Sequence, residues 1–213
     1  MTAPQCVVLA AVLWCSPAGG PAQVAAHDSV VYILTPASRF EVKTGKAGLL
    51  GFAGHGHLVR ARTASGRVVY YPDSPADSRV EVVVPVDSLE VLTPRDTAEI
   101  RKVTETMRSE VLHPDRNPLI SFVSTTVTPA GDGLEVRGRL TIAGQTRDVA
   151  VVMRVEAAGD TLQAIGSFSV KQTEFGITPY RGGPAGTVRV ADRVEFNVAV
   201  VAVRHTDSAT PPP

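Results

Sequence analysis

Two histidines separated by a single glycine are the most chemically suggestive feature of this sequence. His55 and His57 flank Gly56, and residues i and i+2 of a β-strand share a face. A strand here would therefore hold two imidazoles side by side. Such a pair can bind zinc, with His113 or a carboxylate as a third ligand, which makes a metal-assisted enzyme one hypothesis. The pair fits equally a polar contact to a ligand head group, or a purely structural position at the rim of a sheet.

Arg108, Lys171 and Arg181 are the cations that we consider for binding a carboxylate or phosphate head group. The alternative for each of them is an ordinary solvated charge. The sequence has no Gly-x-Ser-x-Gly nucleophile elbow, and no spacing of serine, histidine and aspartate suggests a catalytic triad. Nucleophilic catalysis is therefore not expected. Our prediction is a protein that is not an enzyme and has no cofactor or resident metal, and the metal-assisted enzyme stays the alternative.

The first 26 residues differ from the rest of the chain because they carry no charged side chain. The apolar run from Cys6 to Cys15 is too short to span a bilayer as a helix, and the small residues at Ala25 and Ala26 suit a signal peptidase. We predict a signal peptide over residues 1–26, cleaved near Ala26, and a periplasmic or secreted protein. Both cysteines of the chain lie in this segment, so thiol chemistry is not expected from the mature protein.

The remaining chain is predicted to be one domain over residues 27–204, followed by a disordered tail over 205–213 that ends in three prolines. The 21 basic and 21 acidic residues cancel, so the charge balance gives no sign of nucleic-acid binding. We expect no stable membrane span in the mature chain.

Alternating apolar and polar residues predict strand after strand in this domain. The clearest example runs from Leu134 to Ile142, where apolar residues alternate with Glu135, Arg137 and other polar residues, as in a sheet with one wet face. Gly144-Gln145 and Gly159-Asp160 are predicted to form the next two turns. Pro85 interrupts another alternating run, so that strand is predicted to be an edge or to carry a bulge. About eight antiparallel strands suggest a closed barrel, whose interior is either filled or holds one ligand.

A single amphipathic helix is predicted over about residues 94–112. Thr93 suits the N-cap, and His113-Pro114 ends the helix. Ile100, Val103 and Met107 share one face at helical spacing. This helix is expected to pack across the sheet or to close a barrel mouth.

Taken in order and spacing, several segments resemble the YceI-like, polyisoprenoid-binding family of exported bacterial proteins. The resemblance covers roughly residues 31–203 and rests on Ser38-Arg39-Phe40, Gly51-Phe52-Ala53-Gly54-His55, Val86-Asp87-Ser88-Leu89, Met107 to Leu112, Asn117 to Phe122, Gly138 to Thr146 and Phe175-Gly176-Ile177. It implies a lipocalin-like barrel with a long interior channel, isoprenoid or fatty-acyl ligands, and no catalysis.

These observations predict a carrier or scavenger that holds a long apolar amphiphile inside the barrel. A structural barrel with a filled interior is the alternative alongside the metal-assisted enzyme. The sequence is also compatible with a homodimer. The residues proposed to contact the ligand are Phe52, His55, His57, Ile100, Val103, Met107, Arg108, Phe122, Phe168 and Lys171.

Overall fold

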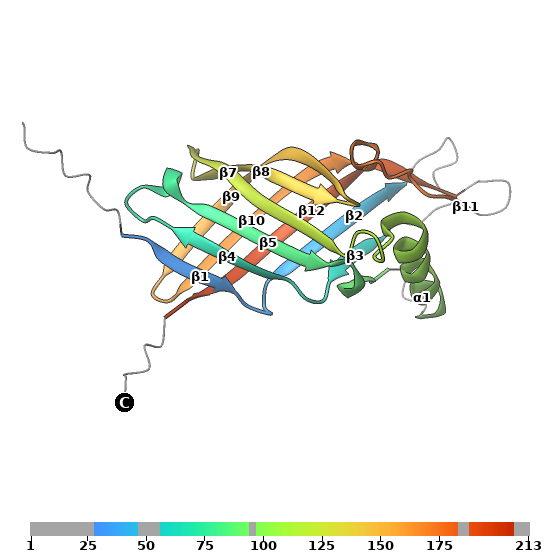
Figure 1. The fold of residues 1–213 in the computed structure, drawn as a ribbon, viewed down its shortest axis with the longest axis horizontal. Coiled ribbons are helices and arrows are strands. Elements are labelled where there is room, and N and C mark those ends of the chain that lie inside the picture. Colours follow the sequence, from blue (N-terminus) through green and yellow to red (C-terminus); the bar gives the residue numbers. More distant parts are fainter. Residues whose placement is uncertain (1–27, 47–55, 94–96, 183–187, 207–213) are drawn as a thin grey trace, which may run out of the picture.

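The computed structural model describes residues 28–46, 56–93, 97–182 and 188–206. The predicted signal peptide, Phe52, His55 and most of the predicted tail lie outside these ranges. The described chain forms an elongated barrel with its first and last described residues at one end (Figure 1). No helix within these ranges is long and apolar enough to cross a membrane.

The strands alternate in direction and close on themselves. Eight of them follow one another around the wall in the order β1, β4, β5, β7, β8, β9, β10, β12, and β12 pairs again with β1. Every pairing is antiparallel. Their bounds are β1 (Val30–Leu34), β4 (Ser65–Tyr70), β5 (Arg79–Pro85), β7 (Leu119–Ala130), β8 (Gly133–Ile142), β9 (Gln145–Ala158), β10 (Thr161–Lys171) and β12 (Val188–Arg204). The predicted eight-stranded antiparallel barrel is thus confirmed.

Shorter strands lengthen this wall at the end that carries the helix. β2 (Arg39–Lys46) pairs with β12 beyond the point where β1 stops, and it is followed across the wall by β3 (Leu58–Ala61) and β6 (Leu89–Val91). The two-residue strand β11 (Arg181–Gly182) pairs with the start of β12. The long strand β12 therefore pairs with β1 toward its C-terminal end and with β2 and β11 toward its N-terminal end.

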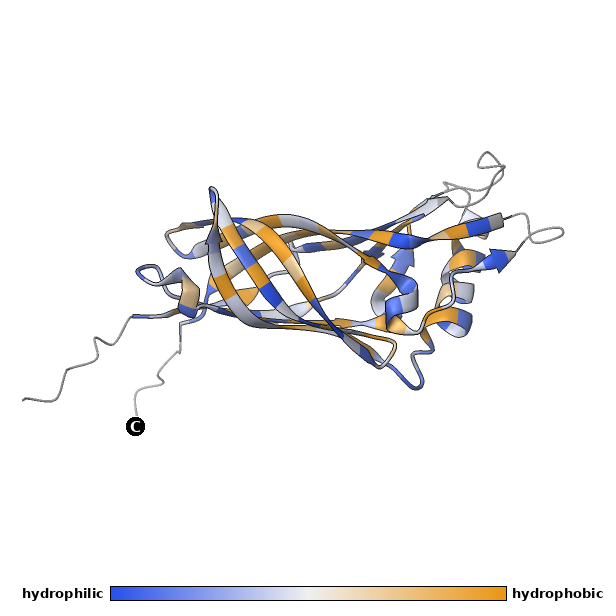
Figure 2. Cartoon of the chain, turned by 90° about the horizontal axis from the view of Figure 1, so that it is seen from above, coloured by the Kyte–Doolittle hydropathy of each residue, from blue (hydrophilic) through white to orange (hydrophobic). Residues whose placement is uncertain are grey.

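Hydrophobic and hydrophilic residues alternate along the strands (Figure 2). On β8, Val136, Leu140 and Ile142 are buried, whereas Arg137 and Arg139 are exposed. Apolar residues on one face of each strand meet inside the barrel and form a single core. The period-two pattern of the sequence therefore marks the inward face correctly.

The turn between β8 and β9 lies one residue earlier than predicted. Ile142 pairs with Gln145, so the two turn residues are Ala143 and Gly144 rather than Gly144 and Gln145. Both have positive φ angles, of 47° and 73°, as a type I′ hairpin turn requires. Alanine rarely adopts a positive φ angle, so the sequence pointed to Gly144 as the first turn residue. That placement shifted the predicted register by one residue. The Gly159-Asp160 turn is confirmed, since Ala158 pairs with Thr161 across it.

Pro85 lies neither on an edge strand nor at a bulge in the β5 ladder. β5 is paired on both sides, with β4 and with β7, in continuous register. The strand ends at Pro85, and a 3₁₀ turn, Val86–Ser88, redirects the chain into β6. The Ser88 hydroxyl donates to the Pro85 carbonyl over 2.7 Å, which holds the bend. The prediction for this strand was therefore wrong, because the proline stands at a strand end.

The predicted helix is present in two forms. Thr97–Thr106 is the α-helix α1, and Met107–Leu112 (η3) continues it as wider π-helical turns. His113 ends the segment in the left-handed region at φ 49°, with its N–H donating to the Arg108 carbonyl over 2.8 Å. The segment covers one end of the barrel (Figure 1). Two further 3₁₀ turns are η1 (Pro75–Asp77) and η4 (Gln172–Phe175).

Candidate ligand-binding site

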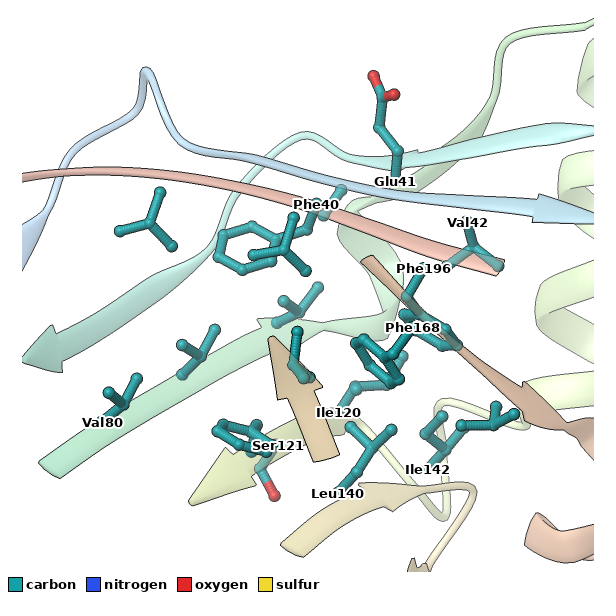
Figure 3. A pocket seen from close by; sticks show the side chains of 18 of the residues that line it. Phe40, Glu41, Val42, Val80, Ile120, Ser121, Leu140, Ile142, Phe168 and Phe196 are labelled. Carbon is teal, nitrogen blue, oxygen red and sulfur yellow. The ribbon is translucent and has the colours of Figure 1, made fainter. Parts of the chain in front are cut away.

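The barrel encloses a cavity of about 290 Å³ that is lined mainly by apolar side chains. This volume lies near the lower limit of the range usual for small-molecule pockets. Phe40, Val42 and Ile120 point into it, whereas Glu41 points away (Figure 3). The lining includes Tyr70, the last residue of β4, and Phe175 of η4. The arrangement can hold an elongated apolar molecule.

An aromatic pair forms part of this lining. Phe168 on β10 and Phe196 on β12 are directly opposite in register, and their rings stack with centroids 4.9 Å apart and planes 14° apart. Phe40 and Phe122 also line the cavity. Phe40 was not among the predicted contacts, although it occupies an apolar position in the alternating β2 sequence that could have indicated it.

The predicted ligand contacts divide into residues that line the cavity and residues that do not. Met107, Phe122 and Phe168 line it. Val103 packs against the core, and Ile100 is half-buried on α1 outside the lining. Lys171 is exposed at the end of β10, also outside the lining. Contact of any of these residues with a ligand stays a prediction.

Arg108 binds the protein's own backbone. Its Nη2 donates to the carbonyls of Asp87 and Leu89 over 2.7 and 2.6 Å. Its Nε is buried and has no hydrogen-bond partner among the described residues. The guanidinium therefore ties the π-helical segment to the bend between β5 and β6, and it does not line the cavity.

Replacing Arg108 by methionine is expected to lower the free energy of unfolding by about 2–3 kcal/mol. Methionine keeps an apolar stem but cannot make the charged hydrogen bonds, which are worth about 1.5–3 kcal/mol. Urea unfolding measures the loss. Arg101→Met, an exposed position on α1, is the control and should change stability by less than about 0.5 kcal/mol. Equal effects of the two substitutions would show that the two backbone contacts of Arg108 contribute nothing.

His57 is held by the chain at the start of β3. Its Nδ1 lies 2.7 Å from the Thr93 carbonyl oxygen, and since a carbonyl only accepts, Nδ1 must carry the proton. Thr93 also accepts from the Leu58 N–H through its Oγ1. Within the ranges that the structure describes, no group of three histidine, cysteine or acidic residues is placed to hold a metal ion. His55 lies outside these ranges.

A second cavity, of about 300 Å³, opens at the helix end, and we call it the vestibule. It shares Val111, Phe175 and Ile177 with the barrel cavity, so the two spaces adjoin. Its polar lining comes from Glu110, His113, Asn117, Gln145 and Thr178. Sequence reasoning did not identify it, because these residues lie on three separate segments.

Phe175, at the junction of the two spaces, is almost fully buried in η4. The N–H and hydroxyl of Thr173 both donate to Asp192 on β12, over 2.9 and 2.8 Å. The backbone hydrogen bond from Thr173 is the main reason that the pKa of Asp192 lies below its ordinary value. These contacts anchor η4 to the barrel wall.

Residues 32–202 match the YceI-like domain. The chain belongs to the YceI-like domain family. Among solved structures, this YceI-like protein is similar to BcnA of Burkholderia cenocepacia, with 22% identity and a TM-score of 0.64, over 80% of this chain and 99% of BcnA. It is also similar to the YCEI protein of Campylobacter jejuni, with 13% identity and a TM-score of 0.54, over 70% and 85% of the two chains. At these identities the similarity shows the fold. No curated protein matches the chain.

Proposed function

We propose that this YceI-like protein is a non-catalytic carrier that binds a long apolar amphiphile, of isoprenoid or fatty-acyl type, inside its barrel. The observation that carries the proposal is the apolar cavity, whose lining includes Tyr70 and Phe175. Membership of the YceI-like family supports it. The apolar leader sequence supports export, so the carrier would act in the periplasm or outside the cell.

The hydrophobic effect alone supplies enough free energy for such binding. Each buried methylene contributes about 0.8 kcal/mol, so ten of them contribute about 8 kcal/mol before the costs of ordering and association are subtracted. Polar groups are then needed only to orient the ligand. Of the two alternatives, the open interior disfavours a filled structural barrel, and no described cluster favours the metal-assisted enzyme.

Native mass spectrometry of the exported, purified protein tests the proposal. We expect a discrete additional mass that solvent extraction resolves into a long-chain lipid. A delipidated sample incubated with geranylgeraniol or palmitic acid should regain a bound mass. A bare protein mass that neither compound changes would contradict the carrier function.

A further inference from the structure

Charged residues on the barrel wall mostly face residues of the opposite charge across neighbouring strands. The directly opposed pairs of opposite sign in the described ladders are Glu41 with Arg60, Arg60 with Glu90, Lys43 with Glu195, Arg67 with Glu81, and Arg139 with Asp148. Such pairs stabilise a sheet. Two pairs in these ladders depart from the rule, and both lie on β12.

The two exceptional pairs each bring two cations together. Arg181 of β11 is directly opposite Arg189, and Lys171 of β10 is directly opposite Arg193. All four side chains are exposed, and none forms an ion pair with an acidic residue in the part of the chain that the structure describes. Like charges directly opposite each other destabilise a sheet. We call these four residues the basic strip, and a bound anionic group would neutralise its repulsion.

The positive charge of the basic strip is greatest at its arginine pair. Glu174 and Asp192 flank the segment that carries Arg181 and Arg189, and no acidic residue lies between them in the sequence. Both flanking carboxylates already accept hydrogen bonds. Glu174 accepts from a backbone N–H over 3.4 Å, and Asp192 accepts from η4 over 2.9 and 2.8 Å. The arginine pair therefore presents a local positive charge on a chain whose net charge is zero.

An exposed aromatic side chain lies next to this pair. Tyr180 is 39% exposed, and its carbonyl accepts from the Val190 N–H over 3.1 Å, which holds it at the base of the β11–β12 ribbon. The ribbon lies at the end of the barrel that carries α1, far from the first and last described residues (Figure 1). Tyrosine beside exposed arginine is a combination suited to the head-group layer of a bilayer, where an aromatic ring and a cation both find favourable surroundings.

We propose that this end of the barrel docks on an anionic membrane surface through Arg181 and Arg189, with Tyr180 in the head-group layer and the rest of the basic strip adding to the attraction. None of the four cations lines the cavity or the vestibule, so docking goes beyond the carrier function and needs no bound ligand. A few cations give weak, reversible attachment rather than insertion. Thr178, two residues before Tyr180, lines the vestibule, so the docked protein turns this end of the barrel toward the bilayer.

Co-sedimentation of the purified protein with lipid vesicles tests the docking surface. We expect binding to vesicles of phosphatidylcholine mixed with phosphatidylglycerol, and much weaker binding to phosphatidylcholine alone. Binding should weaken as salt is added, because the Debye length falls from about 30 Å at 0.01 M to about 10 Å at 0.1 M. Arg181→Gln/Arg189→Gln should lower the partition coefficient about thirtyfold, which corresponds to about 1 kcal/mol for each arginine.

A double variant elsewhere on the wall provides the matched control. Arg67→Gln/Arg139→Gln makes the same change in net charge at two exposed positions that face acidic residues, and it should lower the partition coefficient by less than about threefold. Thermal unfolding should find Arg181→Gln/Arg189→Gln at least as stable as the unmodified protein, because the substitution removes a like-charge pair. Lost vesicle binding would then not result from unfolding.

Three outcomes overturn the docking surface. They are equal binding to both kinds of vesicle, equal losses in the two double variants, and displacement from vesicles by inorganic phosphate at constant ionic strength. The last would show a site for a single phosphate group instead of a membrane surface. The carrier function is tested separately, since the bound mass detected by native mass spectrometry does not depend on vesicles.

Discussion

Replacing Ala164 by phenylalanine is expected to weaken binding of a long-chain ligand by about a hundredfold. Ala164 is buried on β10 and lines the cavity, and its cross-strand neighbours Val155 and Val200 line it too. A phenyl ring here would occupy space that the ligand chain needs. Loss of burial for three to four methylenes, at about 0.8 kcal/mol each, amounts to about 3 kcal/mol, or roughly a hundredfold. Titration of the delipidated protein with geranylgeraniol measures the change.

The neighbouring residue provides the matched control. Ile165 is 54% exposed on the outer face of the same strand, so Ile165→Phe adds aromatic volume without entering the cavity and should leave the affinity unchanged. Thermal unfolding of both variants separates an open interior from a filled one. In an open cavity, Ala164→Phe costs little stability, whereas forcing a ring into a packed core costs about 1–3 kcal/mol. Unaltered ligand affinity in Ala164→Phe would place the ligand outside the barrel.

At Gly138, the addition of a single methyl group is expected to destabilise the barrel wall. A Cβ added there would lie 2.5 Å from both the Phe122 ring and the Val123 carbonyl oxygen, closer than real contacts allow. The carbonyl belongs to the β7 backbone, so the strand pair itself must shift. We expect Gly138→Ala to lower the free energy of unfolding by about 1–3 kcal/mol, measured by urea denaturation.

Two comparisons identify the cause of this loss. Gly45→Ala places a Cβ 3.3 Å from the Ala191 Cβ, a contact that a small adjustment relieves, and it should change stability by less than about 1 kcal/mol. If the Phe122 ring causes part of the clash, the double variant Gly138→Ala/Phe122→Leu should lose less stability than the sum of the single variants. A Gly138→Ala protein as stable as the unmodified one would contradict the close approach described here.

The barrel was predictable from the sequence because alternation reports directly which face of a strand is buried. Val136, Leu140 and Ile142 show this on β8. The turn at Ala143 was placed one residue away because alanine carries no sign of a left-handed backbone. The bend at Pro85 was misjudged because whether a strand is an edge depends on pairing partners that are distant in sequence.

The site was predictable only in its apolar part. Phe122 and Phe168 were identified as lining because aromatic residues on inward faces are easily recognised. Arg108 and Lys171 were considered as anion-binding residues because of their charge. The direction of a long side chain, however, depends on the groups around it, and the Arg108 guanidinium binds two backbone carbonyls. The vestibule brings His113 beside Gln145 and Thr178 through packing of three segments, for which no local pattern exists.

The pairing of β1 with β12 sets the order in which this protein can fold. Tyr32 pairs with Arg204 and Leu34 with Ala202, so the contacts that seal the wall join residues at opposite ends of the domain. Closing so long a loop is slow compared with forming the neighbouring hairpins from β7 to β10. A nascent chain that lacks its last strand can form those hairpins but not the sealed wall. The chain therefore acquires its closed tertiary structure only after synthesis of the domain is essentially complete.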